Sequence, residues 1–414
     1  MSDINKFYKT VSIIQKLFDN KVELLPSVTE LFELELAYLE YKTLDELEYL
    51  ERTAYAKSFK GKYSLHFLKY SDTPEKVIKD RTLITNLYFK NGLFSTGYAT
   101  HSLFPYRGKF HPQLIKGIIN ILGIKKGETI LDPMAGSGTT NIEASLLGIN
   151  SYAIDISPFC QFMIKAKYDA LKIDLNLLNS IDFDIGKLFN YFGQKNILQK
   201  IEKHETGKRE IYELALLAYL DALGYSKRVL RSNHKQLYTK VFNRYIETVK
   251  NLLSNQYFNN KELGNVTILK NSNALNIELP NSSIDGIITS PPYSFAIDYI
   301  ENDKDQLEHL GYDTIELKQN LIGLKGKTKS EKLKNYFSDM DKFIKEASRV
   351  LKQNKFFVII IGSNTNQTGG IRLEQNIIDS AKNNKLNLVK SILKPIKGMR
   401  NTMKEEYILI FEKE

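Results

Sequence analysis

The chain has 414 residues, enough for two or three structural units. Hydrophobic residues make up 42% of it and aromatic residues 11%, so it can bury a core of ordinary size. A single cysteine, Cys160, excludes an internal disulfide, and the six scattered histidines form no Cys/His zinc pattern, so we expect no metal site. The 58 lysines and arginines outnumber the 48 aspartates and glutamates, and the net charge of +10 suits a polyanionic partner.

No segment reaches the roughly 20 apolar residues that a membrane-spanning helix needs. The longest strongly apolar run covers residues 356–361, and residues 1–6 contain no apolar stretch suited to a signal peptide. We therefore expect no membrane association and a reducing cytoplasmic compartment.

The first sixty residues are acidic, with apolar residues at helical spacing in segments 28–40 and 44–51. They predict a helical pair that packs on another part of the chain. Residues 61–100 mix aromatic and polar residues and end in a turn-prone stretch that contains two glycines. We expect a mainly helical accessory region over residues 1–100.

From residue 101 onward, helical and strand patterns alternate. The predicted elements are a helix over 112–122, a strand over 129–132, a helix ending at 147 and a strand over 151–155. This order is typical of a β-α-β unit in a parallel, doubly wound sheet. Residues 101–164 therefore predict the first half of an α/β domain.

A helical insertion is expected to interrupt this domain over residues 165–264, partly basic at 227–250. Strand and helix patterns resume afterwards. The predicted elements are strands over 266–269 and 284–288, a helix over 339–351, a strand over 356–361, a helix over 374–385 and a strand over 406–411. Residues 265–414 therefore predict the second half of the same α/β domain.

A glycine-rich turn follows the predicted strand over 129–132. Gly136 and Gly138 would let a ligand approach the backbone, and the following helix would offer free N–H groups. No Gly-Lys-Ser/Thr follows, so the turn is not a nucleotide-hydrolase phosphate loop. Asp155 ends the next strand, where a carboxylate can accept hydrogen bonds from ribose. These features predict an adenosine-containing cofactor, although a tight strand-to-helix turn can need glycines for steric reasons alone.

The tetrapeptide Ser290-Pro291-Pro292-Tyr293 follows the predicted strand over 284–288. Two prolines fix φ and remove two N–H donors, so the chain leaves the strand as a rigid arm with free carbonyl acceptors. A serine oxygen, a proline carbonyl and a tyrosine ring together suit an exocyclic amine on a flat base. A plain proline turn would explain the prolines but not the serine and the tyrosine.

With these two motifs the sequence resembles the S-adenosylmethionine-dependent amino-methyltransferases of DNA, which act on cytosine N4 or adenine N6. The family's cofactor motif is similar to residues 132–138, and its catalytic motif is similar to residues 290–293. A third similarity, over 104–112, is to the family segment that contacts the methionine part of the cofactor. The resemblance covers roughly 101–160 and 265–414. It implies a Rossmann-like methyltransferase fold with a mostly parallel seven-stranded sheet, and S-adenosyl-L-methionine as the cofactor.

The resemblance also implies roles for individual residues. The catalytic residues would be Ser290, Pro291, Pro292 and Tyr293. The cofactor-binding residues would be Lys109, Phe110, His111, Asp132, Pro133, Ala135, Gly136, Gly138, Asp155, Asn273 and Ala274. Within this set, Asp132 and Gly136 would lie at the amino-acid end of the cofactor and Asp155 at the ribose. The chain departs from the family where an aspartate often precedes alanine, because Asn273 occupies that position, beside the adenine amino group.

The implied reaction is direct methyl transfer to an exocyclic amine of a base flipped out of the duplex, with Tyr293 as the stacking platform. Methylation at cytosine C5 would need a thiolate, and Cys160 is interpreted as a small buried residue. In the family, Ser-Pro-Pro-Tyr is associated mainly with cytosine N4, so we prefer that base to adenine N6. The alternatives are an RNA amino-methyltransferase that acts on tRNA and a non-catalytic DNA-binding or specificity partner.

Two basic segments, 226–244 and 318–334, are candidates for contact with DNA phosphates. The residues proposed for this contact are Lys227, Arg228, Arg231, Lys325 and Lys327. A charge-rich helix can also be merely solvated. The expected partners are double-stranded DNA and, in a restriction-modification system, a cognate restriction endonuclease; the expected location is the prokaryotic cytoplasm, on the nucleoid.

Overall fold

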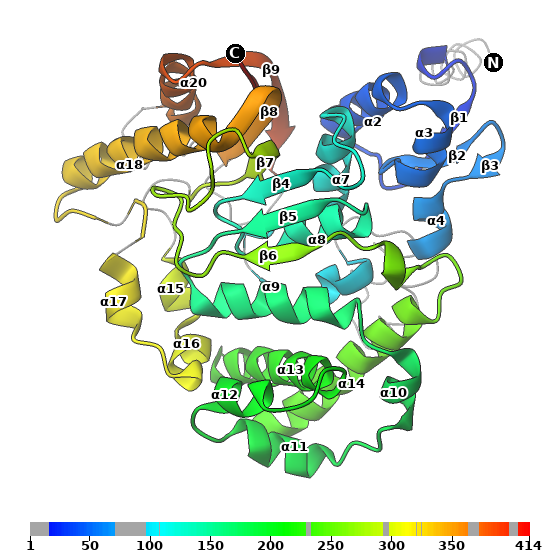
Figure 1. The fold of residues 1–414 in the computed structure, drawn as a ribbon, viewed down its shortest axis with the longest axis vertical. Coiled ribbons are helices and arrows are strands. Elements are labelled where there is room, and N and C mark those ends of the chain that lie inside the picture. Colours follow the sequence, from blue (N-terminus) through cyan, green and yellow to red (C-terminus); the bar gives the residue numbers. More distant parts are fainter. Residues whose placement is uncertain are drawn as a thin grey trace, which may run out of the picture.

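The computed structural model describes residues 16–70, 97–106, 108–228, 233–292, 298–319, 321–323, 325–362, 372–396 and 405–414. At its centre is a seven-stranded sheet with the order β6-β5-β4-β7-β8-β10-β9 (Figure 1). The strands are β4 (Thr129–Asp132), β5 (Asn150–Ala153), β6 (Val266–Ile268), β7 (Ile284–Thr289), β8 (Leu351–Gly362), β9 (Leu386–Pro395) and β10 (Glu405–Lys413). All neighbours from β6 to β8 pair in parallel, and β10 is antiparallel to β8 and β9. The predicted Rossmann-like, mostly parallel seven-stranded sheet is confirmed.

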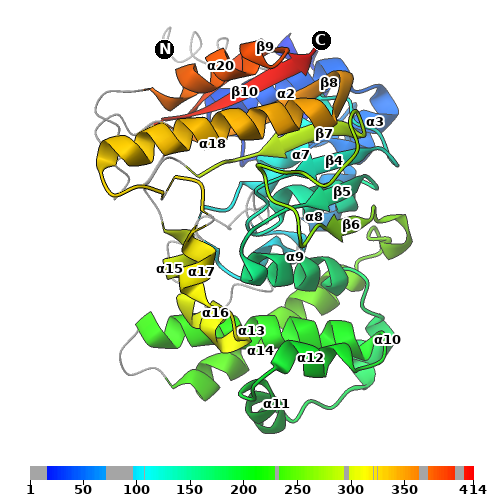
Figure 2. The ribbon, with the colours of Figure 1, turned by 60° about the vertical axis from the view of Figure 1, so that its left-hand side comes forward.

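Helices cover both faces of this sheet. On one face, α7 (Pro112–Ile121) packs its apolar residues against strand residues such as Ile130 and Ile288. On the other face, α18 (Lys329–Val350) and α20 (Leu373–Asn383) pack against Leu131 of β4 and Ile287 of β7. Figure 2 shows α18 and α20 side by side. Nearly all residues of β4 and β7 are buried. Since successive strand side chains point to opposite faces, both faces of these two strands are covered.

The N-terminal region contains the predicted helical pair. The pair is α2 (Leu31–Thr43) and α3 (Glu46–Arg52), and a third helix, α4 (Leu65–Tyr70), follows. A small antiparallel sheet is formed by β1 (Val22–Leu24), β2 (Ala56–Phe59) and β3 (Lys62–Tyr63). The expectation that the pair packs on another part of the chain is confirmed, since α2 lies on α7. The fully buried Glu40 of α2 accepts hydrogen bonds from Asn120 Nδ2 at 2.6 Å and Thr53 Oγ1 at 2.9 Å. The three short strands were not predicted.

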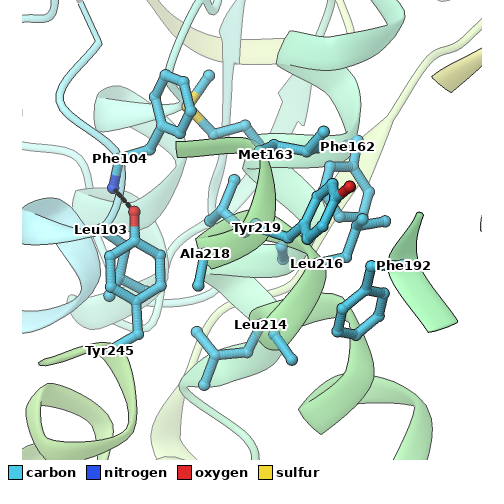
Figure 3. Close-up of a cluster of buried hydrophobic side chains, with 14 of the residues drawn as sticks. Leu103, Phe104, Phe162, Met163, Phe192, Leu214, Leu216, Ala218, Tyr219 and Tyr245 are labelled. Carbon is cyan, nitrogen blue, oxygen red and sulfur yellow. Dashed lines mark hydrogen bonds between the residues drawn. The ribbon is translucent and has the colours of Figure 1, made fainter. Parts of the chain in front are cut away.

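The segment between β5 and β6 is helical. It contains α9 (Pro158–Ala170), α10 (Leu175–Ser180), α11 (Ile185–Phe192), α12 (Ile197–Glu202), α13 (Lys208–Arg228) and α14 (His234–Leu253). In Figure 1, α9 lies between the sheet and the layer formed by α13 and α14. Phe104 N–H donates to the Tyr245 hydroxyl at 2.6 Å (Figure 3), which fixes the segment before α7 to the helical layer.

The chain after β7 runs toward the same helical layer. It forms α15 (Tyr299–Asn302), α16 (Lys304–Leu310) and α17 (Thr314–Gln319) before α18 begins. Helix α16 packs on both α9 and α13. The chain that follows the Ser-Pro-Pro-Tyr motif is therefore anchored on the helices inserted between β5 and β6.

Candidate active site

The two motifs singled out in the sequence follow neighbouring strands. In the sheet, Ile130 of β4 pairs with Gly286 of β7, and Leu131 pairs with Ile287. The strand order reverses direction at this pair, since the chain proceeds from β4 to β5 on one side and reaches β7 on the other. Open α/β sheets bind their ligands at the carboxyl ends of strands at such a switch point. The glycine turn and Ser290 therefore leave the sheet at the edge where a ligand is expected.

A buried hydrogen bond joins the ends of these two strands. Thr289 Oγ1 donates to Asp132 Oδ1 at 2.8 Å, and neither residue is exposed to solvent. Met134 N–H donates to the same carboxylate oxygen at 3.2 Å. Burial raises the pKa of Asp132 to about 6, against the opposing effect of these hydrogen bonds. Asp132 is therefore a structural link between the two motifs, in addition to being a predicted cofactor residue.

We expect Thr289→Val to lower the free energy of unfolding by about 1–3 kcal/mol, because Asp132 would stay buried and lose a hydrogen-bond donor. Urea denaturation at pH 7 measures the change. Thr289→Ser, which keeps the hydroxyl, should retain most of the stability. A valine variant as stable as the wild type would show that the link contributes nothing.

The two glycines of the turn have different surroundings. Both have positive φ, +51° at Gly136 and +76° at Gly138. A Cβ at Gly138 would lie 2.7 Å from Ile164 Cγ1 of α9, whereas one at Gly136 would meet only the Tyr106 ring, at 3.4 Å. Gly138 is thus required for the packing of α9, and only Gly136 matches the expectation that a missing side chain leaves the backbone open to a ligand. Pro133 and Ala135, in the same turn, are buried.

Asp155 lies beside this turn, two residues beyond β5, which ends at Ala153 rather than at the predicted residue 155. Its Oδ2 accepts the Gly136 N–H at 2.8 Å, and its Oδ1 accepts the Ser157 N–H at 2.8 Å. Enclosure raises the pKa of Asp155 to about 6, although both hydrogen bonds favour the ionised form. The carboxylate predicted to bind ribose is therefore held in place by the backbone of the glycine turn itself.

The segment that precedes α7 approaches the same edge of the sheet. Lys109 Nζ donates to the His101 carbonyl at 2.7 Å, and Phe110 packs on the core beneath α7. His111 is the N-cap residue of α7, and burial lowers its pKa to about 3, with further lowering by Lys394 and Lys109. At Gly108 a Cβ would lie 3.4 Å from the Tyr299 hydroxyl of α15.

Beyond β6 lies the segment that would bind adenine. Asn273 is exposed, and its side-chain carbonyl accepts the Leu275 N–H at 2.9 Å. Ala274 is buried. Because β6 follows β5 in the sheet, Asn273 lies on the side of Asp155 away from β7.

The catalytic tetrapeptide is described as far as its second proline. Pro291 is buried, and Ser290 and Pro292 are half-buried directly after β7. Tyr293 lies outside the described residues. The single thiol, Cys160, is buried on α9 and donates to the Tyr106 hydroxyl at 3.4 Å. Burial raises the pKa of Cys160 well above its usual range, as expected for a structural cysteine rather than a nucleophile.

Sequence reasoning missed two residues beside the glycine turn. The Tyr106 ring lies over Gly136, and Lys167 of α9 donates from Nζ to the Ser137 carbonyl at 3.2 Å. The available signal was the spacing of Cys160, Ile164 and Lys167, which places all three on one face of a helix.

The proposed DNA-contacting residues are placed as follows. Lys227 and Lys327 are exposed, and Lys325 Nζ lies 3.4 Å from Asp339 Oδ2. Arg228 ends α13, and Arg231 lies outside the described residues.

The aromatic residues interleaved in the basic segment, by contrast, are not surface groups. Tyr238, Phe242 and Tyr245 are buried in the core of the helical layer, and Arg244 pairs with Asp221 at 3.1 Å. The pattern reflects an amphipathic helix, so these rings are not available for stacking on bases.

Two family models match the chain. The model described as DNA methylase matches residues 32–165 and 284–414, which is more than half of the chain. The model described as RMKL-like, methyltransferase domain matches residues 102–316. No helix of the described residues is long and apolar enough to cross a membrane. In the same part of the chain, no group of three or more His, Cys, Asp or Glu side chains could hold a metal ion.

Two similar proteins are type II methyltransferases. The type II methyltransferase M.BsoBI of Geobacillus stearothermophilus is 27% identical over 301 residues, 58% of this chain and 59% of that protein. The chain therefore spans about three fifths of the length of that relative. The type II methyltransferase M.MvaI of Kocuria varians is 23% identical over 359 residues, 66% of this chain and 78% of that protein.

Among solved structures, TrmN from Thermus thermophilus matches 74% of this chain and 50% of its own, with a TM-score of 0.32 and 12% identity. A likeness this weak adds nothing to the fold assignment, which rests on the order and direction of the strands. From the family-model matches and the motifs at the carboxyl ends of β4 and β7, the chain belongs to the DNA methylase family, the amino-methyltransferases that use S-adenosyl-L-methionine.

Proposed function

We propose that the protein transfers a methyl group from S-adenosylmethionine to the exocyclic N4 amine of cytosine in double-stranded DNA, as the modification enzyme of a restriction-modification system. The observation that carries this proposal is the meeting of the glycine turn and the Ser290–Pro292 segment at one sheet edge, joined by the Thr289–Asp132 hydrogen bond. Membership of the family supports the methyl donor and the amine acceptor. The names of M.BsoBI and M.MvaI support the type II class.

The residues around the glycine turn fit this cofactor. At Gly136 the backbone can be approached, since a Cβ there would meet only the Tyr106 ring. Asp155 offers carboxylate oxygens suited to ribose hydroxyls, and the exposed Asn273 offers an amide suited to adenine. Lys109 would lie toward the methionine part. Once bound, the cofactor supplies a methyl group on a positively charged sulfur.

The chain's own residues would position the amine and stabilise it electrostatically for methyl transfer. An exocyclic amine conjugated to its ring is a poor nucleophile. Hydrogen bonds from that amine to Ser290 Oγ and the Pro291 carbonyl would favour a pyramidal nitrogen with an available lone pair, aimed at the methyl group. The methylated nitrogen then loses a proton. No covalent enzyme intermediate is needed, which agrees with a Cys160 thiol that stays protonated. Tyr293 would stack on the flipped base.

We expect the affinity for S-adenosylmethionine to rise as the pH increases through about 6. The pKa of Asp155 is raised to about 6, so its carboxyl is protonated below this pH and ionised above it. Only the ionised form keeps both oxygens as acceptors for ribose hydroxyls beside the two backbone N–H groups. Isothermal titration calorimetry between pH 5 and pH 8 measures the effect. Asp155→Asn should bind weakly at every pH, and an unchanged pH profile in this variant would assign the titration to another group.

The product assay tests the proposal directly. Purified protein is incubated with S-adenosylmethionine and either unmethylated DNA or bulk tRNA, and the nucleosides are identified by mass spectrometry, with Ser290→Ala as the control. We expect N4-methylcytosine in DNA, formed about 10²- to 10³-fold more slowly by the variant. N6-methyladenine would keep the mechanism and replace the base. Methylated tRNA would move the enzyme to RNA, and binding of both ligands without product would support a specificity partner.

Contact with DNA phosphates is tested by charge reversal at the two exposed lysines. Lys227→Glu and Lys327→Glu are each expected to weaken DNA binding and to reduce the slope of log K against log[salt] by about 1 per lost contact. The matched control is Lys62→Glu on β3, an exposed lysine in the N-terminal region. Affinity and salt slope that match those of the control would remove these lysines from the interface.

A further inference from the structure

Lys167 is a lysine in an unusual position. It lies on α9 with 1% of its surface exposed, and its ammonium donates to the Ser137 carbonyl, between the two glycines of the turn. Lys165, two residues earlier, is half-buried and has two charged partners. Its side chain is 39% exposed and forms ion pairs with Asp169 at 2.8 Å and Glu213 at 2.5 Å.

Lys167 has no such ion pair. Within the described part of the chain, no carboxylate lies within 4.0 Å of its ammonium. The charge of Asp221 acts on Lys167 from a distance, but this carboxylate has other partners: it binds Arg244 at 3.1 Å and the Tyr245 hydroxyl at 2.9 Å.

The electrostatic surroundings of Lys167 therefore favour a bound anion. Burial lowers the pKa of Lys167 well below its usual range, and the positive charge of Lys109 lowers it further. Taking an ammonium out of water without a counter-charge is costly, and one carbonyl oxygen satisfies only one of its three donors. An anion bound at this position would offset that cost for Lys167.

The cofactor of the proposed reaction carries such an anion. S-adenosylmethionine has a carboxylate at its amino-acid end, and that end is expected beside Asp132, Gly136 and Lys109. Lys167 approaches the glycine turn from α9, whereas Lys109 belongs to the segment before α7. Two cations from different elements thus lie around the part of the turn assigned to the methionine moiety.

We propose that Lys167 is the buried counter-charge for the methionine carboxylate of S-adenosylmethionine, held against the glycine turn by its hydrogen bond to Ser137. The inference rests on the proposed cofactor and adds a recognition residue that neither sequence motif contains. It acts on binding rather than on the transferred methyl group.

The test compares two ligands that differ only in the carboxylate. Dissociation constants for S-adenosylmethionine and its decarboxylated analogue are measured by calorimetry with the wild type, Lys167→Met and the control Lys165→Met. We expect Lys167→Met to weaken S-adenosylmethionine about tenfold or more, because truncating one partner of a buried charge pair is expensive. The same variant should bind the decarboxylated analogue within about twofold of the wild type. Lys165→Met should change neither constant.

An equal loss for both ligands would show that Lys167 only supports the turn and would overturn the inference, as would an unchanged constant for S-adenosylmethionine. A wild type that binds neither ligand would instead contradict the proposed function. Lys167→Gln provides a second variant, since it keeps an N–H donor for Ser137 and removes the charge. Thermal melting without ligand checks that each variant is folded.

Discussion

Replacing Ser290 with alanine is expected to lower the rate of methyl transfer about 10²- to 10³-fold, the usual effect of removing one positioned polar group from an active site. Ser290 directly follows β7, and the bond that joins this strand to Asp132 comes from Thr289 instead. The sheet edge and the glycine turn should therefore survive the change, and the dissociation constant for S-adenosylmethionine should stay within about twofold. Single-turnover kinetics with DNA and calorimetry with the cofactor separate these two quantities.

Ser283 provides the matched control for this experiment. It precedes β7 at the opposite end of the same strand, and its hydroxyl donates to the Pro280 carbonyl at 2.7 Å. Ser283→Ala removes the same atom far from the carboxyl edge of the sheet and should leave the rate unchanged. If Ser290→Ala retains wild-type turnover, the amine is not positioned by this hydroxyl, and the proposed role of the tetrapeptide is wrong.

Much of the fold follows from local patterns in the sequence. The strand predicted over 129–132 is β4, and the helix predicted over 112–122 is α7 within one residue. Both are buried, so their apolar periodicity is strong. Strand β9 was missed because it lies at the sheet edge and most of its residues are exposed or half-exposed, including Val389. Its pairing with β10 depends on a distant part of the chain.

Helix and strand boundaries were less predictable where the surface is polar. Helix α18 begins at Lys329, ten residues before the predicted start, because Thr328 and Glu331 form a capping box in a lysine-rich stretch. Strand β8 begins at Leu351 rather than at 356. In both cases the added residues are largely solvent-facing, so the hydrophobic pattern used for the prediction carries little signal there.

The two motifs of the candidate site could be predicted from the sequence, but the residues that pack against the glycine turn could not. The motifs around Asp132 and Ser290 were identified from local sequence, because glycine, proline and aspartate at strand ends have specific physical reasons. The buried Lys167 and the Tyr106 ring come to the turn through tertiary packing: helical spacing places Lys167 on the same face as Cys160, but it does not say which part of the chain that face contacts. For the same reason, the basic and aromatic residues interleaved over 226–244 were interpreted together as a candidate phosphate-contacting segment, although Tyr238 and Phe242 belong to the buried side of α14.

The difference between the two glycines of the turn leads to a second large effect. Gly138→Ala is expected to lower the free energy of unfolding by about 2–5 kcal/mol, because a left-handed φ costs about 1–2 kcal/mol and overpacking adds about 1–3 kcal/mol. The overpacking arises because the new Cβ would lie 2.7 Å from Ile164 Cγ1. Gly136→Ala has only the backbone cost of about 1–2 kcal/mol, because its nearest neighbour, the Tyr106 ring, is 3.4 Å away. Urea denaturation of both variants gives the comparison.

Cofactor binding should follow a different pattern from stability. Gly136→Ala places a methyl group on the open side of the turn, so this variant should bind S-adenosylmethionine more weakly than the wild type does. Its loss of about 1–2 kcal/mol in stability would not by itself explain the weaker binding. The steric origin of the Gly138 effect is tested by a double-mutant cycle with Ile164→Ala, which removes the contacting atoms. In that background Gly138→Ala should cost about 1–2 kcal/mol, the backbone part alone. An undiminished cost would mean that α9 does not constrain the turn, and that Gly138, like Gly136, is conformationally required for reasons internal to the loop.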